Sequence, residues 1–254
     1  MNFMGRPNFE SDQVKRVSFY ATPDHDCPYL DGRHAVTLFA DPYAQLDNHV
    51  YAKLAQYGFR RSGRHIYRPA CPSCSACVPV RLPVNEFIPN RNQRRTGLRN
   101  QDITVQTTPA VYNEEQHQLY MKYITARHPG GGMDVPEADK YMDFLVADWT
   151  DTEFVEFRLA DKLVAVAVID LFEQGMSAVY TFFDPELDRR SLGTMAILWQ
   201  IEACRKRSLQ WLYLGYWIPG CQKMQYKNLF KPLQRFHNGV WHAANEQTEQ
   251  MAAL

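Results

Sequence analysis

The pattern of apolar and polar positions is clearest in the second half of the chain, where it predicts three strands in succession. Short polar turns at 160–162 and 173–175 separate runs rich in β-branched and aromatic residues, which cover Glu153–Leu159, Leu163–Phe172 and Met176–Phe183. Strands joined by such short turns form an antiparallel meander. After Asp184-Pro185 breaks the meander, the pattern predicts an amphipathic helix and one more strand, at Ser191–Ser208 and Trp211–Tyr216.

The first half of the chain mixes short strands with helices. Similar apolar runs predict strands at Val17–Thr22, Ala35–Phe39, His65–Arg68, Val78–Val84 and Ile103–Thr107. A helix is expected to open at Asp41-Pro42, because apolar residues then recur at helical spacing until Gly58. The remaining predicted helices are a short basic one within Pro89–Asn100 and two longer ones near Asn113–Arg127 and Pro136–Trp149.

The order of these elements indicates the fold class. Three strands, a loop, a helix and a further strand match the core of the Gcn5-related N-acyltransferase fold, in which a splayed sheet and a helix N-terminus bind an acyl carrier. We therefore predict an α/β (α+β) protein with a Gcn5-related N-acyltransferase-like core. We expect three regions: a Cys- and Arg-rich N-terminal region at 1–100, an acyltransferase-like domain at 101–245, and a C-terminal tail at 246–254.

The distribution of charge tells more than its total. The chain carries 28 Lys and Arg residues against 28 Asp and Glu residues. Between Asn48 and Gln101, however, ten basic residues accompany a single acid, Glu86, which gives a local charge of +9. Nine of the ten are Arg, whose guanidinium forks match phosphate oxygens, so contact with nucleic acid is favoured over a merely solvated face. The expected phosphate contacts are Arg91, Arg94, Arg95 and Arg99.

Three cysteines precede the basic helix at equal spacing. Cys71, Cys74 and Cys77 form a C-x2-C-x2-C run, and Cys27 is the nearest candidate for a fourth ligand. Thiolates at such spacing bind zinc or an iron–sulfur cluster, and the alternative is a buried, reduced cluster without metal. The sequence shows neither a signal peptide nor an apolar run long enough to span a membrane, so we expect a cytoplasmic protein whose thiols are reduced or bind metal.

Two short motifs could carry chemistry. Arg190 and Gly193 fit the R-x-x-G-x-G/A pattern of acetyl-coenzyme-A enzymes, but Met195 stands where Gly or Ala is expected. Backbone N–H groups of Ser191 and Gly193 at the helix start could bind a phosphate or an oxyanion, or Ser191 could simply cap the helix. His128 lies in a glycine-rich loop and could serve as a general acid or base, although most single histidines have no such role.

Five segments together resemble the arginyl-tRNA–protein transferase family, and most closely its bacterial aspartate/glutamate leucyltransferase branch. They are CPYLDGRHAVTLFADP, GFRRSGRHIYRPACPSCSACVPVR, NRNQRRTGLRN, YTFFDPELDRRSLGT and YLGYWIPGCQKMQYKNLFKP, and they occur in family order over nearly the whole chain. Relatives in eukaryotes transfer Arg and carry C-G-Y-C where this chain has Cys27-Pro-Tyr-Leu30. The missing second cysteine favours the bacterial branch.

The resemblance implies a reaction. An aminoacyl group, Leu in the bacterial branch and Arg in the other, moves from tRNA to the α-amine of a protein with N-terminal Asp or Glu, which is thereby marked for N-degron proteolysis. The aminoacyl ester is already activated, so no cofactor is required for the chemistry. We expect Tyr216 and Lys227 to face the reacting centre or the acceptor carboxylate, and the four arginines to hold tRNA phosphates. Two rivals are an acetyl-coenzyme-A N-acetyltransferase and a non-catalytic RNA-binding module with a zinc knuckle.

Overall fold

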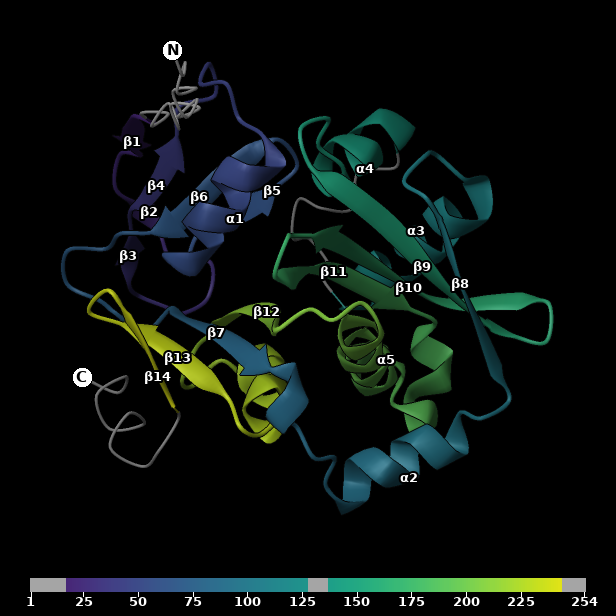
Figure 1. The fold of residues 1–254 in the computed structure, drawn as a ribbon. Coiled ribbons are helices and arrows are strands. Elements are labelled where there is room, and N and C mark those ends of the chain that lie inside the picture. Colours follow the sequence, from purple (N-terminus) through teal and green to yellow (C-terminus); the bar gives the residue numbers. More distant parts are fainter. Residues whose placement is uncertain (1–16, 128–136, 244–254) are drawn as a thin grey trace, which may run out of the picture.

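An eight-stranded sheet forms the centre of the molecule in a computed structural model that describes residues 17–127 and 137–243 (Figure 1). Its strand order is β14-β13-β7-β12-β11-β10-β9-β8. The strands are β7 (Val78–Pro83), β8 (Ile103–Pro109), β9 (Asp151–Leu159), β10 (Lys162–Leu171), β11 (Gly175–Phe183), β12 (Trp211–Trp217), β13 (Gln234–His237) and β14 (Val240–Ala243). The predicted meander is thus confirmed, whereas β13 and β14 were not expected.

The sheet opens where its two parallel strands meet. β11 and β12 pair only from Gly175↔Trp211 to Ser177↔Tyr213, although both strands continue beyond these residues. Next to this point, the pairing of β10 with β11 shifts register after Val168, and the pairing of β12 with β7 shifts after Tyr213. Bulges of this kind bend a strand and end regular pairing. The two strands therefore diverge and leave a gap between them, as expected for an acyltransferase-like core.

Helices cover both faces of the sheet (Figure 1). On one face α5 (Leu192–Lys206) packs its apolar side on strand residues such as Val155, Ala167 and Ile169. On the other face α3 (Glu114–Arg127) and α4 (Ala138–Leu145) pack on Phe154, Val168 and neighbouring side chains. Val155 and Phe154 are adjacent in the chain and point to opposite faces, as strand geometry requires. Among the described residues, no helix is both long enough and apolar enough to cross a membrane.

A smaller layer precedes the sheet in sequence. It has a four-stranded sheet in the order β1-β4-β6-β5, a two-stranded ribbon and one helix. The elements are β1 (Phe19–Ala21), β2 (His25–Asp26), β3 (His34–Ala35), β4 (Thr37–Ala40), α1 (Asn48–Gln56), β5 (Arg60–Ser62) and β6 (His65–Pro69). The helix expected to open at Asp41-Pro42 begins later, because the Asp47 side chain accepts a hydrogen bond from Val50 N at 2.8 Å and caps it there. Asp41 instead accepts from Tyr43 N in a turn.

The basic helix α2 (Arg91–Arg99) follows β7 in sequence and packs against α5. Asn90 and Gln93 form a reciprocal capping box at its start, which fixes where it begins. Its buried side consists of Gln93 and Thr96, and Asn100 ends it by donating to Arg190 O at 2.8 Å. The start of α5 therefore lies beside the end of α2.

The sheet itself crosses the boundary expected near residue 100. β7 belongs to the N-terminal region in sequence, yet it pairs with β12 from Trp211↔Pro83 to Trp217↔Val78. On its other side β7 pairs with β13. The remaining short elements are the 3-10 helices η1 (Val84–Glu86), η2 (Pro185–Arg190) and η3 (Gln222–Leu229). Part of the predicted helix from Pro136, the loop with His128 and the tail at 246–254 lie outside the described residues.

Candidate active site between the splayed strands

Lys227 and Tyr216, the two residues expected at the reacting centre, lie in contact. Lys227 Nζ donates to the backbone oxygen of Tyr216 at 2.6 Å, and the lysine side chain is buried. The Tyr216 hydroxyl points elsewhere and donates to Gly58 O at 2.9 Å. β12 carries Tyr216 and η3 carries Lys227, so this strand and the 3-10 helix that follows it form the contact.

The environment of Lys227 favours an uncharged amine. Burial lowers the pKa of Lys227 well below its ordinary value of 10.5, and the positive charge of Arg60 lowers it further. A neutral lysine amine has a lone pair that can accept a proton. Burial also raises the pKa of Tyr216 well above 10.0, so its hydroxyl stays protonated. Of the two groups, only Lys227 is suited to act as a base.

Arg60 lies in the gap between the diverging strands, although the charge pattern assigned it only to the basic window. Its Nη2 donates to the backbone oxygens of Ala178 and Val179 on β11, at 2.7 and 2.9 Å. On the side of β12, Gly215 has a φ of +79°, and a Cβ there would overlap the Arg60 guanidinium. Gly inside a predicted strand often marks such a close approach, and this was the signal for Arg60 in the sequence.

Ser191 and Gly193 lie at the start of α5, as expected. Ser191 stands at the N-cap with a φ of +54°, but its side chain makes no capping hydrogen bond. A Cβ at Gly193 would come within 3.3 Å of Phe183 Cε1, so this glycine allows the helix to approach β11 closely. Among the described residues no hydrogen bond joins these two residues to Lys227. The structure therefore places them beside the end of α2 rather than at the lysine.

The four arginines of α2 are exposed, in agreement with a contact surface. Arg94 donates to Pro89 O at 2.7 Å, and Arg99 donates to Arg189 O, which brings the last turn of α2 to the exposed Arg189. Arg91 and Arg95 are exposed on the same helix. The helix and Arg189 together form a basic surface next to the N-terminus of α5, which we call the α2 surface.

The rest of the basic window between Asn48 and Gln101 does not form a uniform surface for binding a polyanion. Arg61 is fully buried and forms an ion pair with Asp170, at 2.6 Å. Arg81 stacks on the ring of Trp211, with 3.7 Å from its guanidinium carbon to the ring centroid. Arg60 and Arg61 of β5 thus join the smaller layer to the central sheet, whereas Arg81 packs within the central sheet. These arginines are buried or half-buried against acids, aromatic rings and backbone oxygens. A count of charges along the chain does not reveal such partners.

The cysteines gather around one pocket of about 160 Å³. Burial raises the pKa of Cys77 to about 12, and the nearby Cys27, Cys71, Cys74 and Cys221 add to the shift. Val36 N donates to Cys71 Sγ at 3.5 Å, and Arg33 donates to Cys74 Sγ at the same distance. In the part of the chain that the structure describes, no three His, Cys, Asp or Glu side chains are arranged to hold a metal ion. The thiols thus converge, but their geometry does not fit a metal, and we derive no step through one.

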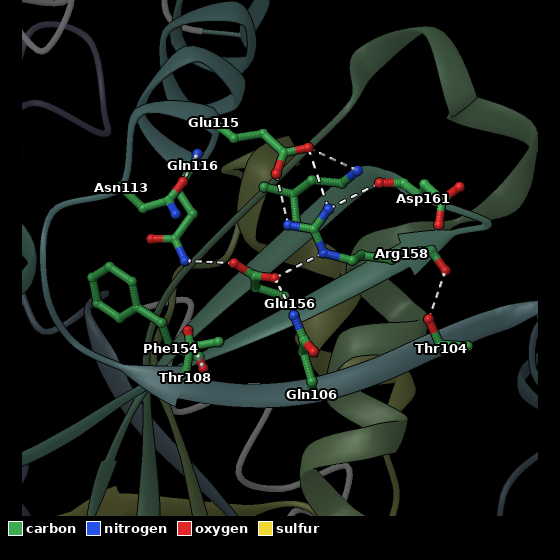
Figure 2. A network of polar contacts seen from close by, with 11 residues as sticks. Thr104, Gln106, Thr108, Asn113, Glu115, Gln116, Phe154, Glu156, Arg158 and Asp161 are labelled. Carbon is green, nitrogen blue, oxygen red and sulfur yellow. Dashed lines mark hydrogen bonds and ion pairs between the residues drawn. The ribbon is translucent and has the colours of Figure 1, made fainter.

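A second polar network lies away from Lys227 and tethers α3 to the outer strands (Figure 2). Buried Glu156 on β9 accepts from Gln116 of α3 at 2.8 Å and from Gln106 of β8 at 2.7 Å. Arg158 donates to Glu156 and also pairs with Glu115, at 2.6 Å. Burial alone would raise the pKa of Glu156, but hydrogen bonds from Gln116, Gln106 and Arg158 lower it. This carboxylate is fully engaged in holding the fold.

Comparison with known proteins agrees with this architecture. The chain matches the model for the N terminus of arginine-tRNA-protein transferase at residues 25–95 and that for its C terminus at residues 115–237. Two relatives named aspartate/glutamate leucyltransferase are similar over nearly their whole length. The protein from Marinobacter nauticus is 49% identical over 90% of this chain and 96% of its own. The protein from Pseudomonas putida is 50% identical over 92% and 99%.

The solved structures add to the description of the fold. The crystal structure of FemX is 10% identical and has a TM-score of 0.51, covering 93% of this chain and 90% of the other. At this identity the likeness concerns the fold alone, and it agrees with the predicted mixed α/β class and acyltransferase-like core. The family models and the relatives together identify the protein family. The chain belongs to the arginine-tRNA-protein transferase family.

Proposed function

We propose that this protein transfers leucine from Leu-tRNA to the α-amine of proteins that begin with Asp or Glu, and so marks them for N-degron proteolysis in the cytoplasm. The relatives that are about half identical to it carry the name of this activity. They align over 90% or more of the chain, and the matched C-terminal family model at residues 115–237 covers β11, β12 and η3. The aminoacyl ester supplies the activated carbonyl, so the protein has to position the amine and handle its proton.

Lys227 is the group best suited to accept that proton. The acceptor α-amine attacks the ester carbonyl, and a tetrahedral intermediate forms. The proton lost by the amine passes to the neutral Lys227 amine while the new C–N bond forms. The C–O bond to the tRNA ribose then breaks, and the proton is delivered to the leaving oxygen. The observation that carries this assignment is the buried Lys227 amine, held 2.6 Å from the backbone oxygen of Tyr216 at the open end of β12.

The α2 surface is proposed to hold the acceptor end of the tRNA. Its four exposed arginines lie on one short helix beside the N-terminus of α5, with Ser191 and Gly193. Arginine side chains and free backbone N–H groups both bind phosphate oxygens. This arrangement supports a path for the tRNA backbone along α2 toward α5, with the ester reaching the gap between β11 and β12.

The test is transfer of radiolabelled amino acid from charged tRNA to short peptides. Leu-tRNA and Arg-tRNA are each offered with peptides that begin with Asp, Glu, Lys or Ala. We expect label to move from Leu-tRNA to the Asp and Glu peptides only. Label from Arg-tRNA instead, the donor that the family description names, would keep the reaction and overturn the donor. Binding of tRNA without transfer would favour an RNA-binding module, and transfer from acetyl-coenzyme A would favour an N-acetyltransferase.

A further inference from the structure

Arg60 differs from three other buried or half-buried arginines in what surrounds its charge. Arg61 pairs with Asp170, Arg158 with Glu115 and Glu156, and Arg190 with Asp102. Arg60 donates to two backbone oxygens, and among the described residues it forms no ion pair with an acidic side chain. Backbone oxygens orient a guanidinium but do not neutralise it. A guanidinium that is held in a partly buried gap without an acid can take an anionic group as its partner.

The position of Arg60 is fixed from both sides. Nη2 bonds to Ala178 and Val179, where the β10–β11 register shifts and both backbone oxygens turn toward the gap. Gly215 leaves room for the guanidinium on the opposite strand. A planar guanidinium has five N–H donors, and the hydrogen bonds to Ala178 O and Val179 O use only Nη2. Donors thus remain for a carboxylate, with the orientation already set by the protein.

The charge of Arg60 acts on Lys227, Tyr216 and Tyr29, so these groups are its electrostatic neighbours. Tyr216 and Tyr29, with Tyr67, also line the pocket of about 160 Å³ described above. A cavity of this size can hold a group the size of benzene, and hence one amino-acid side chain. Arg60 and Lys227 do not line this pocket themselves. The pocket reaches β12 at Tyr216, whose backbone oxygen accepts from Lys227, and the Arg60 guanidinium packs against the preceding residue, Gly215.

We propose that Arg60 recognises the side-chain carboxylate of the acceptor's N-terminal Asp or Glu and thereby sets the preference for acidic acceptors. This assignment rests on the proposed transfer reaction. The α-amine and the side-chain carboxylate of an N-terminal Asp are attached to neighbouring carbons, so their two receptors have to be close. Arg60 and Lys227 meet this requirement, one as the partner of the carboxylate and the other as the acceptor of the amine's proton.

The experiment compares kcat/KM for leucine transfer to matched peptides that begin with Asp or Asn, and with Glu or Gln. Arg60→Gln keeps an amide that can donate to Ala178 O and Val179 O, but it removes the charge and the fork. We expect the Asp-over-Asn ratio to fall about ten- to a hundredfold, mainly through a higher KM for the Asp peptide, because a hydrogen-bonded charge pair is lost. Arg60→Lys, which keeps the charge, should retain part of the ratio.

Arg68→Gln is the matched control. Arg68 lies on the adjacent strand β6, donates to Tyr57 O at 3.3 Å and stacks over Phe59. Its replacement therefore removes one charge from the same region without changing the gap between β11 and β12. Its Asp-over-Asn ratio should equal that of the wild type. If Arg60→Gln lowers transfer to Asp and Asn peptides equally, Arg60 is only structural and the assignment is wrong.

A binding measurement covers the case in which Arg60→Gln has no measurable turnover. Calorimetric titration of the folded variant with the Asp and Asn peptides should show that the preference for binding the Asp peptide is lost. Retained preference would overturn the role of Arg60 while leaving the transfer reaction intact. Absence of leucine transfer by the wild-type protein would overturn the transfer reaction first, and the two failures are thus distinguished.

Discussion

Lys227 carries an amine into a place where an ammonium ion would be poorly solvated. The side chain is buried, and its amine donates a hydrogen bond to the Tyr216 backbone oxygen. Arg60 adds a like charge nearby. Burial of an amine in this way destabilises the fold unless the amine stays neutral. The simplest explanation for a residue that lowers stability in this way is a functional role, which agrees with the proposed action of Lys227 as a base.

This gives a prediction about stability and pH. Between the lowered pKa of Lys227 and its ordinary value of 10.5, the unfolded chain binds a proton that the folded protein does not. Unfolding is therefore favoured as pH falls through this window, and stability rises with pH. Lys227→Met should abolish transfer and raise the melting temperature at neutral pH, by about 2–4 °C for each kcal/mol gained. The gain should vanish as pH approaches 10.5.

Calorimetric melting curves at a series of pH values would measure the effect. Lys206→Met on the exposed end of α5 is a suitable control, because its amine is solvated in both states. That change should leave stability within about 0.5 kcal/mol. A Lys227→Met protein that is less stable than the wild type at neutral pH would mean that the amine is held by favourable interactions and is charged.

At the scale of elements, a buried ion pair joins the smaller layer to the central sheet. Arg61 of β5 binds Asp170 of β10 through Nε and Nη2, both at 2.6 Å, and Thr152 of β9 donates to the same carboxylate. Burial alone would lower the pKa of Arg61, but Asp170 raises it through hydrogen bonds and charge. The pair is fully excluded from water, so each partner depends on the other.

Removing one partner should therefore be far more harmful than removing both. Arg61→Met leaves Asp170 as an unpaired buried carboxylate, and we expect a loss of about 3–5 kcal/mol in the free energy of unfolding. The double variant Arg61→Met/Asp170→Leu should recover much of this loss. Urea denaturation measures both. Arg64→Met breaks the exposed pair with Asp148 and should cost less than about 1 kcal/mol; similar losses at Arg61 and Arg64 would contradict the argument.

The sequence could predict those elements whose patterns are local. The meander, α3 and α5 follow from long apolar runs and clear breaks, and the structure places them close to the expected bounds. β13 was missed because its four residues, Gln234–His237, show no apolar alternation. The start of α1 was misplaced because Asp41 and Asp47 are equally good capping residues by type. In the structure Asp47 accepts from Val50 N and caps the helix, whereas Asp41 accepts from Tyr43 N in a turn.

The site was predictable to a similar degree. The sequence assigned Lys227 and Tyr216 to one candidate centre, and in the structure the Lys227 amine donates to the Tyr216 backbone oxygen; their roles in the reaction stay predictions. Arg60 could not be assigned from its own surroundings in sequence, since its partners are backbone oxygens more than a hundred residues away. Backbone oxygens have no sequence signature. The one available sign was Gly215, a glycine inside an otherwise apolar strand.

At the scale of the whole molecule, charge is sorted between interior and surface. Arg60 and Arg61 join the smaller layer to the central sheet, whereas the α2 surface faces solvent. Replacing Arg91, Arg94, Arg95 and Arg99 by Ala should weaken tRNA binding and reduce the slope of log K against log salt by about three, because up to four phosphate contacts are lost. Filter binding at several salt concentrations measures the slope. The same slope for variant and wild type would place the tRNA on another surface.

The shared sheet has a consequence for how such proteins can be divided or recombined. β7 is an interior strand, held between β12 and β13. A fragment that begins after residue 100 would lack it and expose the edge of β12, which invites association with other strands. Exchange of halves between distant relatives would also separate β7 from the side chains it packs with. In this family we therefore expect the two matched regions to be inherited together. Chimeras should fold only when β7 comes from the same relative as its partner strands.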